Sequence, residues 1–180
     1  MCGIAGIWTS NGPDQQNQQA HKILNKQQHR GPDHQATCVV DDITLGHNRL
    51  AIIDLNANAN QPFISSCGRY SLVFNGEIYN YLELKVGLNY PFKTQSDTEV
   101  LLASYIQYGV ACLGKFNGMF SFALYDSKEK ILFCARDRVG KKPFVYSEHE
   151  SGFYFASEVA ALFCLGVFND EQDEIGVAYS

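Results

Sequence analysis

Short runs of β-forming residues, each bounded by turn residues, recur along this 180-residue chain. Four of them follow one another at residues 119–125, 131–136, 144–146 and 153–156, separated by segments such as Asp126-Ser127-Lys128. Strands joined by so few residues pair as antiparallel hairpins, because a parallel crossover needs a dozen residues or more. Further runs at residues 4–8, 36–40, 43–50 and 72–74 extend the same pattern, the last of them ending at Asn75-Gly76. The sequence therefore predicts antiparallel sheets.

Helical patterns occupy separate blocks. They are expected at residues 15–28, from Asp97 to about Tyr108, and at residues 157–165. Ser96 and Glu99 have the spacing of a capping box, in which the serine oxygen and the glutamate three residues later satisfy the free N–H groups of a helix start. Sheet strands and helices in separate blocks indicate an α+β fold rather than a βαβ nucleotide-binding sheet. No glycine-rich phosphate-binding loop occurs in the sequence.

Composition excludes several functions. The chain is 46% hydrophobic and 18% charged with a net charge of −5, which indicates one globular domain and disfavours binding to nucleic acid or membrane surfaces. No apolar stretch reaches the ~20 residues of a membrane helix, and no signal peptide is evident, so a cytoplasmic protein is expected. The six cysteines form no CxxC pair or zinc-ligand spacing, and no disulfide framework or metal site is predicted.

Cys2 becomes the first residue if the initiator methionine is removed. A thiol attacks as thiolate, and free cysteine has a pKa of about 8.5, so it needs a nearby base. The freed α-amine, with a pKa of about 7.7 to 8.0, supplies one on the same residue. Cysteine at this position therefore points to an N-terminal nucleophile, although a cysteine at position two can also occur by chance.

Seven separated motifs resemble, in order and spacing, the glutaminase domain of glutamine-hydrolysing asparagine synthetases. This domain is a class II glutamine amidotransferase of the N-terminal-nucleophile hydrolase superfamily. The motifs are residues 2–6 (CGIAG), 30–33 (RGPD), 49–54 (RLAIID), 75–80 (NGEIYN), 96–99 (SDTE), 118–120 (GMF) and 136–143 (RDRVGKKP). The resemblance implies a four-layer αββα sandwich of two antiparallel sheets between helices, and hydrolysis of L-glutamine to glutamate and ammonia.

The resemblance also implies a catalytic site. Cys2 would be the nucleophile, and Asn75 with the Gly76 N–H would form the oxyanion hole, where losing one donor costs on the order of 3 kcal/mol. Asn-Gly is also the usual dipeptide of a hairpin turn, and it can serve both purposes. His47 is expected to be structural, because the α-amine already provides a base.

Substrate-binding residues follow from the same motifs. Arg49 would hold the glutamine carboxylate with its guanidinium fork, and Glu77 and Asp97 would bind the ammonium. Asp97 could instead be only a first-turn acid that favours the helix dipole. Ile52 and Ile53 are expected to line the site with backbone carbonyls, an apolar pair in a strand being ordinarily core.

Two other motif residues, Arg30 and Asp33, are expected to form an ion-paired loop that shapes the pocket.

The matched region is residues 2–165, and residues 166–180 resemble a linker or the start of a further domain. Asparagine synthetases carry a C-terminal domain that uses ATP and Mg²⁺ to activate aspartate, and its Ser-Gly-Gly-x-Asp-Ser loop is absent from these 180 residues. We therefore expect this sequence to be part of a longer protein, with no cofactor in this part. The segment 81–92 is expected to hold a shorter helix than is usual in the family.

Two alternatives stay open at this stage. The chain could be the amidotransferase domain of a sugar-amidating or purine-pathway enzyme, although residues 49–54 and 75–80 favour the asparagine synthetase branch. It could also be a catalytically silent scaffold in which retained Met1 blocks Cys2.

Overall fold

Two antiparallel sheets pack face to face in the computed structural model, which describes residues 1–149 and 152–166. The first sheet has the strand order β2-β3-β1-β9-β8 and the second has the order β4-β5-β6-β7. The strands of the first sheet are β1 (Gly3–Thr9), β2 (His34–Val40), β3 (Ile43–Arg49), β8 (Val145–His149) and β9 (Gly152–Ala156). Those of the second are β4 (Phe63–Ile64), β5 (Tyr70–Ile78), β6 (Gly118–Asp126) and β7 (Ile131–Arg136).

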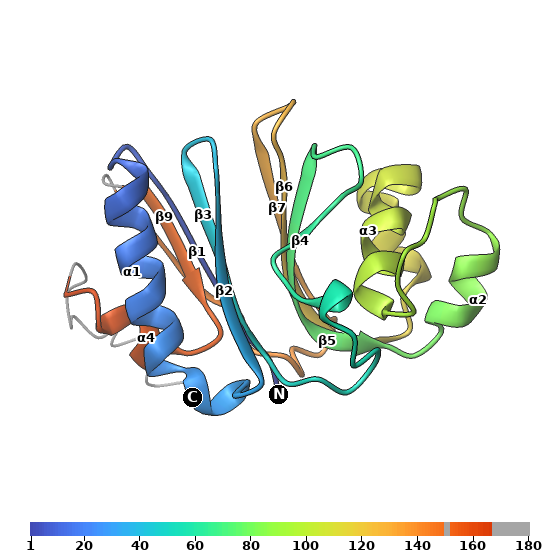
Figure 1. Ribbon diagram of the computed structural model, residues 1–180, viewed down its shortest axis with the longest axis horizontal. Helices are drawn as coiled ribbons and strands as arrows, with labels where there is room; N and C mark the ends of the chain where they lie inside the picture. Colours follow the sequence, from blue (N-terminus) through green and yellow to red (C-terminus); the bar gives the residue numbers. More distant parts are fainter. Residues whose placement is uncertain (150–151, 167–180) are drawn as a thin grey trace.

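Helices cover the two outer faces, as Figure 1 shows. Helices α1 (Pro13–Lys26) and α4 (Val159–Phe163) lie on the first sheet, whereas α3 (Asp97–Tyr108) covers the second and α2 (Tyr81–Val86) packs beside α3. The α+β four-layer sandwich predicted from the resemblance is confirmed. Three short 3₁₀ helices lie in the connections: η1 (Gln28–Arg30), η2 (Ala57–Ala59) and η3 (Gly109–Lys115).

The core between the two sheets determines their spacing. Apolar side chains of both inner faces meet there, and in the first sheet Gly6 lets the ring of Phe155 lie across β1, since a Cβ at this glycine would stand 2.0 Å from a ring carbon. The buried members of this layer are Ile4, Ile43, Leu45, Val73, Ala123, Tyr125 and Phe155. Separate apolar clusters join α1 and α4 to the first sheet and α3 to the second.

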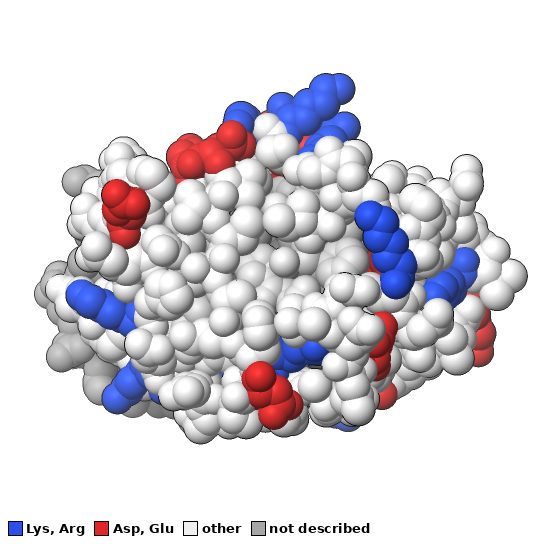
Figure 2. Space-filling view, viewed as in Figure 1, with Lys and Arg blue, Asp and Glu red and all other residues white. Residues whose placement is uncertain are grey.

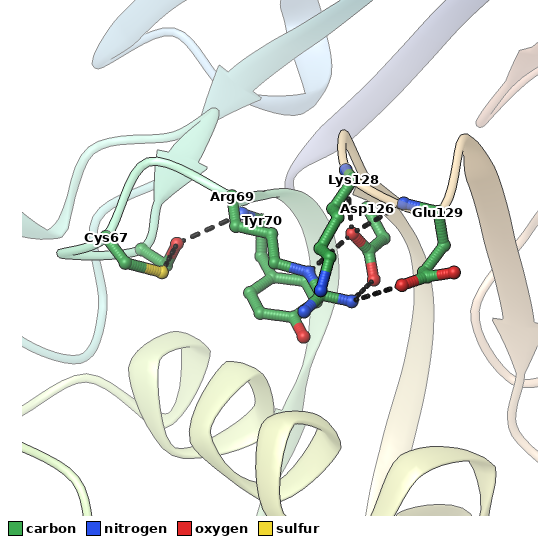
Figure 3. A network of polar contacts seen from close by, with 7 residues as sticks. Cys67, Arg69, Tyr70, Asp126, Lys128 and Glu129 are labelled. Carbon is green, nitrogen blue, oxygen red and sulfur yellow. Dashed lines mark hydrogen bonds and ion pairs between the residues drawn. The ribbon is translucent and has the colours of Figure 1, made fainter.

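An ion-pair cluster fixes the register of β5 against β6 at the end where Tyr70 pairs with Asp126 (Figure 3). Arg69 donates two hydrogen bonds to Asp126, at 2.7 and 2.6 Å, and lies 3.4 Å from Glu129. The carboxylate of Asp126 also accepts the backbone N–H of Lys128 at 3.0 Å, which closes the turn to β7. A bidentate pair of this kind sets geometry as well as energy, and it favours the observed register at this end of β5.

Asn75 and Gly76 do not form a turn, so the predicted strand end at Phe74 is wrong. Strand β5 continues to Ile78, and it pairs with β6 over nine residues. The glycine is needed for packing, because a Cβ at Gly76 would lie 2.4 Å from the Met119 carbonyl oxygen on β6. The long partner strand overrides the turn preference of the Asn-Gly dipeptide.

Helix α3 begins at the predicted residue, but its start differs from a capping box. Ser96 is the N-cap and accepts the N–H of Thr98 at 3.1 Å. The side chain of Glu99 turns to the preceding loop instead of the N-cap, and accepts bonds from Lys93 N–H at 3.1 Å and from Thr94 N–H and Oγ1 at 2.7 Å. Glu99 is fully buried, so the carboxylate organises the loop that leads into the helix.

The remaining elements lie close to their predicted positions. The expected helices at 15–28 and 157–165 are α1 and α4, the second of which is only five residues long. Helix α2 has six residues, which agrees with the expected short helix in the segment 81–92. The predicted linker, apart from its first residue, lies outside the described residues, and the proposed boundary at 165 stays a prediction.

Charged side chains are scattered over the face drawn in Figure 2 rather than gathered in one basic patch. Within the residues described, no helix is long and apolar enough to cross a membrane.

We expect Glu99→Ala to lower the free energy of unfolding by about 3 kcal/mol. Hydrogen bonds to a charged group contribute about 1.5 to 3 kcal/mol each, and the change leaves the buried N–H of Thr94 without its acceptor. Urea unfolding followed by circular dichroism measures the effect. Glu83→Ala, at an exposed position on α2, is the control and should stay within about 0.5 kcal/mol of the wild type. Equal losses in both variants would contradict this account.

Candidate active site

A pocket of about 220 Å³ opens where the chain terminus meets β5 and the start of α3. Figure 1 shows the N-terminus between neighbouring ends of the two sheets. Every residue predicted for the site lies in its wall: Cys2, Arg49, Ile52, Ile53, Asn75, Gly76, Glu77 and Asp97. The structure therefore brings together residues from four separate sequence motifs.

The alternation of side chains along β5 determines the direction in which Asn75 and Glu77 point. Successive side chains of a strand point to opposite faces, and Val73 of β5 lies in the core between the sheets. Asn75 and Glu77 are two and four residues further along, so they share that inner face. Cys2 immediately precedes β1 of the opposite sheet. The sandwich thus places the cysteine across from the Asn75 and Glu77 side chains.

The outer edge of β5 presents backbone N–H groups of alternate residues. Because β4 pairs with β5 only at Leu72 and Ser71, side chains satisfy the edge beyond it. Gln61 Oε1 accepts the N–H of Phe74 at 2.6 Å, and Asp97 Oδ2 accepts the N–H of Ile78 at 3.0 Å. The Gly76 N–H lies between these two and points the same way, toward the pocket that Gly76 lines.

Asn75 supplies a second donor beside the Gly76 N–H. Its side chain is only 1% exposed, and Nδ2 has no hydrogen-bond partner within residues 1–149 and 152–166. Buried amide groups are nearly always hydrogen-bonded, and an unpaired one costs about 1 to 3 kcal/mol. An unsatisfied NH₂ in a pocket wall is well suited to meet an oxygen of a ligand.

Cys2 is half-buried, and its thiol lies against Leu50. The Leu50 N–H donates to Sγ at 3.4 Å, and the Leu50 carbonyl oxygen lies 3.7 Å from the same sulfur. Burial raises the pKa of the Cys2 thiol above its usual value, whereas the Leu50 backbone, the N-terminal amine and the cationic side chains of Arg49 and Lys142 act in the opposite direction. The thiol therefore depends on nearby positive charge to ionise.

The side chain of Arg30 binds the backbone of Cys2. Its Nε donates to the Cys2 carbonyl oxygen at 3.0 Å, and Nη1 lies 3.0 Å from Glu158. The predicted ion pair between Arg30 and Asp33 is absent among the described contacts, because Glu158 takes the guanidinium and Asp33 instead accepts the Ala51 N–H at 2.8 Å. Neither residue lines the pocket itself, although Arg30 binds the backbone of Cys2, which does, so their expected effect on its shape stays a prediction.

Arg49 is 6% exposed, and the loop after β3 occupies part of its guanidinium. Nη1 donates to Asn60 Oδ1 at 2.6 Å and to the Asn56 carbonyl oxygen at 3.2 Å, and Nη2 donates to the Asp54 carbonyl oxygen. A guanidinium has five N–H groups. No bond to a described residue uses Nε–H, so this charged donor remains for a ligand, and a carboxylate oxygen suits it.

Asp97 does more than favour the helix dipole. It is the first residue of α3, only 4% exposed, and ties the helix to β5 through Ile78. Burial raises the pKa of Asp97 to about 6, against the lowering effect of its backbone bonds to Ile78 and Thr98, and the charge of Glu77 raises it further. Two carboxylates on one wall of a pocket favour a cationic ligand between them.

His47 is structural, as the sequence predicted. It is fully buried, and Nε2 donates to the carbonyl oxygen of Phe74 at 3.1 Å, which joins β3 of one sheet to β5 of the other. Burial lowers its pKa to about 3, so the ring is neutral near pH 7.

Sequence reasoning missed several residues of the pocket wall, among them Gln61 and Lys142. Gln61 gave no signal, because its role depends on a strand edge that β4 leaves uncovered. Lys142 lies within the quoted motif 136–143, and its burial to 6% exposure could not be foreseen from a Lys-Lys pair. Of the residues described, no group of three or more His, Cys, Asp or Glu side chains could hold a metal ion.

The fold has a close counterpart among solved structures. Glutamine phosphoribosylpyrophosphate amidotransferase from Bacillus subtilis superposes with a TM-score of 0.78 at 24% identity, over 92% of this chain and 44% of that chain. This likeness confirms the predicted sandwich of two antiparallel sheets between helices. A family model described as the glutamine amidotransferase domain matches residues 1–179. The chain belongs to the glutamine amidotransferase domain family.

Curated relatives give a finer comparison. The chain is 38% identical over 168 residues to glutamine-hydrolysing asparagine synthetase 3 of Bacillus subtilis, a match of 90% of this chain and 27% of the relative. It is 39% identical over 166 residues to glutamine-hydrolysing asparagine synthetase B of Escherichia coli, with 90% and 30% covered. The first curated relatives are much longer, and the match spans only 22% to 37% of their length.

The raised pKa of Asp97 predicts a pH-dependent stability difference. The folded protein holds the Asp97 proton more tightly than the unfolded chain, so its contribution to stability is lost as pH rises from about 4 to about 6, by about 3 kcal/mol at about 1.4 kcal/mol per pKa unit. The side chain of Asp97→Asn cannot ionise. The melting temperature of this variant should therefore rise relative to that of the wild type as pH increases from about 4 to about 6.

Thermal unfolding between pH 4 and 7.5, without glutamine, measures this difference. Asp14→Asn, an exposed acid in the first turn of α1, is the control and should follow the wild type. A constant difference between Asp97→Asn and the wild type over the whole pH range would contradict the prediction.

Proposed function

We propose that this domain hydrolyses L-glutamine to glutamate and ammonia with Cys2 as the nucleophile. The observation that carries the proposal is the pair of donors on β5: the buried, unpartnered Nδ2 of Asn75 and the N–H of Gly76, facing the pocket that holds Cys2. Two donors beside a nucleophile are suited to stabilise the oxygen that becomes negative when an amide carbon is attacked.

The reaction follows from these groups. The Cys2 thiolate attacks the side-chain amide carbon of glutamine, and the negative charge moves to the amide oxygen between Asn75 and Gly76. The nitrogen of this tetrahedral species takes a proton, and collapse of the species breaks the carbon–nitrogen bond, expels ammonia and leaves a thioester on Sγ. Water then attacks the thioester and releases glutamate and the thiol. The α-amine of Cys2, free once Met1 is removed, is the proposed carrier of the proton in each step.

The charged side chains of the pocket wall match the two charges of an amino acid. The Nε–H of Arg49, which no bond to a described residue uses, is proposed to bind the glutamine carboxylate. Glu77 and Asp97 are proposed to bind its ammonium, which would also exclude amides that lack an amine. Ile52 and Ile53 lie in the wall next to Arg49, and their backbone carbonyls are proposed to line the amino-acid end.

The proposed destination of the ammonia is a C-terminal synthetase domain that converts aspartate to asparagine in the full-length protein, in the cytoplasm. Support comes from the 38% to 39% identity to asparagine synthetases, compared with 24% to the phosphoribosylpyrophosphate amidotransferase. ATP and Mg²⁺ would belong to that domain, and no residue of this chain is assigned to them.

Loss of the nucleophile tests the function directly. We expect the chain with Met1 removed to release glutamate and ammonia from glutamine, and Cys2→Ala to reduce the rate about 10³-fold or more. Cys67→Ala, at an exposed cysteine outside the pocket, is the control and should keep full activity. Intact mass establishes whether Met1 is removed. Hydrolysis by Cys2→Ala at the wild-type rate, or none by the processed wild type, would overturn the proposal.

Asn75→Ala should lower kcat about 10²- to 10³-fold and change KM much less, since an oxyanion contact strengthens in the transition state. Steady-state glutaminase kinetics separate the two constants. Ser121→Ala is a matched control, because Ser121 pairs with Asn75 across the strands and is buried but does not line the pocket. If KM rose while kcat stayed constant, Asn75 would be a binding residue rather than an oxyanion donor.

A further inference from the structure

The turn between β7 and β8 is built around Asp137, and it carries a lysine into the active-site pocket. Asp137 Oδ1 accepts the N–H of Lys141 at 2.8 Å, and Oδ2 accepts the N–H groups of Lys142 at 2.9 Å and Phe120 at 3.2 Å. One carboxylate therefore joins the turn to β6, the strand beside Asn75 and Gly76.

Arg136 fixes the same turn from the other side. Its Nε donates to the Lys142 carbonyl oxygen and its Nη2 to the Gly140 carbonyl oxygen, both at 2.5 Å. Gly140 has φ +65, a conformation that side chains disfavour, which accounts for glycine at this position. With both backbone groups of Lys142 bound, its side chain has a defined direction, and it lies in the pocket wall with Cys2 and Glu77.

The contacts of Lys142 do not explain why its side chain is buried. Lys142 is 6% exposed, and its ammonium makes no hydrogen bond or ion pair with a side chain among the described residues. Buried lysines are normally paired, and desolvation lowers the pKa of Lys142, while the charges of Cys2 and Glu77 raise it. The ammonium is thus directed at the groups of the active site.

Resting on the glutaminase function proposed above, we propose that the Lys142 ammonium is a positioning residue that stabilises the thiolate of Cys2. The other charges near Cys2 are the N-terminal amine, which belongs to Met1 until Met1 is removed, Arg49, Arg30 at the Cys2 carbonyl oxygen, and the acids Glu77 and Asp97, which also line the pocket.

Lys142 is the cation best placed to persist during the reaction. A substrate carboxylate would neutralise Arg49, and a substrate ammonium would neutralise the acids. The α-amine must be uncharged to act as a base. Arg30 is already paired with Glu158 at 3.0 Å. Of the described cations near Cys2, this leaves Lys142 to keep a positive charge toward the sulfur when substrate is bound, because glutamine offers it no second anion.

The test measures thiol reactivity without glutamine. Iodoacetamide alkylates the thiolate, in which the sulfur displaces iodide, and mass spectrometry of the N-terminal peptide reports modification of Cys2 alone. We expect Lys142→Met to slow alkylation at pH 7 about three- to tenfold and to shift its pH profile, and the acidic limb of kcat/KM, to higher pH.

Lys141→Met is the matched control, since this neighbour is exposed and bonds Asp137 only through its backbone. It should react as the wild type does, and Lys142→Arg, which restores the charge, should recover most of the rate. Lys142→Gln serves if the methionine variant does not fold.

An unchanged alkylation profile in Lys142→Met would overturn the inference, as would a rise in KM alone, which would make Lys142 a substrate ligand. Equal slowing in Lys142→Arg, with the fold intact, would also overturn it, because charge would then not be the cause. Alkylation does not require glutamine turnover, so a failure of the proposed glutaminase function would be visible separately.

Discussion

The uncovered edge of β5 is the constraint on which the candidate site depends. Strand β4 is two residues long, so the N–H groups of β5 beyond Leu72 need acceptors from elsewhere. Gln61 and Asp97 accept two of them, at Phe74 and Ile78, and the N–H of Gly76 between these positions remains directed at the pocket. A longer β4 would pair this donor with a carbonyl oxygen and remove it from the site. The short strand is therefore a condition for the proposed chemistry.

The same two acceptors assemble the rest of the wall. Gln61 also donates to Thr98 Oγ1 at 3.3 Å, so it connects β5 to the first turn of α3. His47 fastens the carbonyl oxygen of Phe74 to β3 in the opposite sheet. Both backbone groups of Phe74 are thus held by side chains, one within its own half of the sandwich and one across it. The residue next to Phe74 is Asn75, whose amide must be placed within a few tenths of an ångström to act as an oxyanion donor.

Local sequence patterns predicted most elements because short β-runs and the Ser96 cap have local causes. They failed where a distant partner decides the outcome. Asn75-Gly76 prefers a turn by itself, yet nine residues of pairing with β6 keep it in a strand. Glu99 has capping-box spacing, yet the N–H groups of Lys93 and Thr94 compete for its carboxylate. The site residues were found through motif resemblance, which carries three-dimensional information that periodicity lacks. Gln61 and Lys142 were not predicted, because their roles depend on contacts between distant parts of the chain. Gln61 binds the uncovered edge of β5, and the β7–β8 turn carries Lys142 into the pocket.

Charge layout explains why so small a pocket can hold several ionised groups. Cations from β3 and the β7–β8 turn and acids from β5 and α3 all line it. The raised pKa of Asp97 and the lowered pKa of Lys142 both record the cost of burying a charge that no described residue of opposite charge pairs with. A zwitterion would supply counter-charges to Arg49 and the acids together, and the free energy gained on binding would offset that cost. Lys142 would keep its charge toward the sulfur, where the reaction needs an anion. A site strained by unpaired charge in the free protein is thereby matched to a ligand that carries both signs.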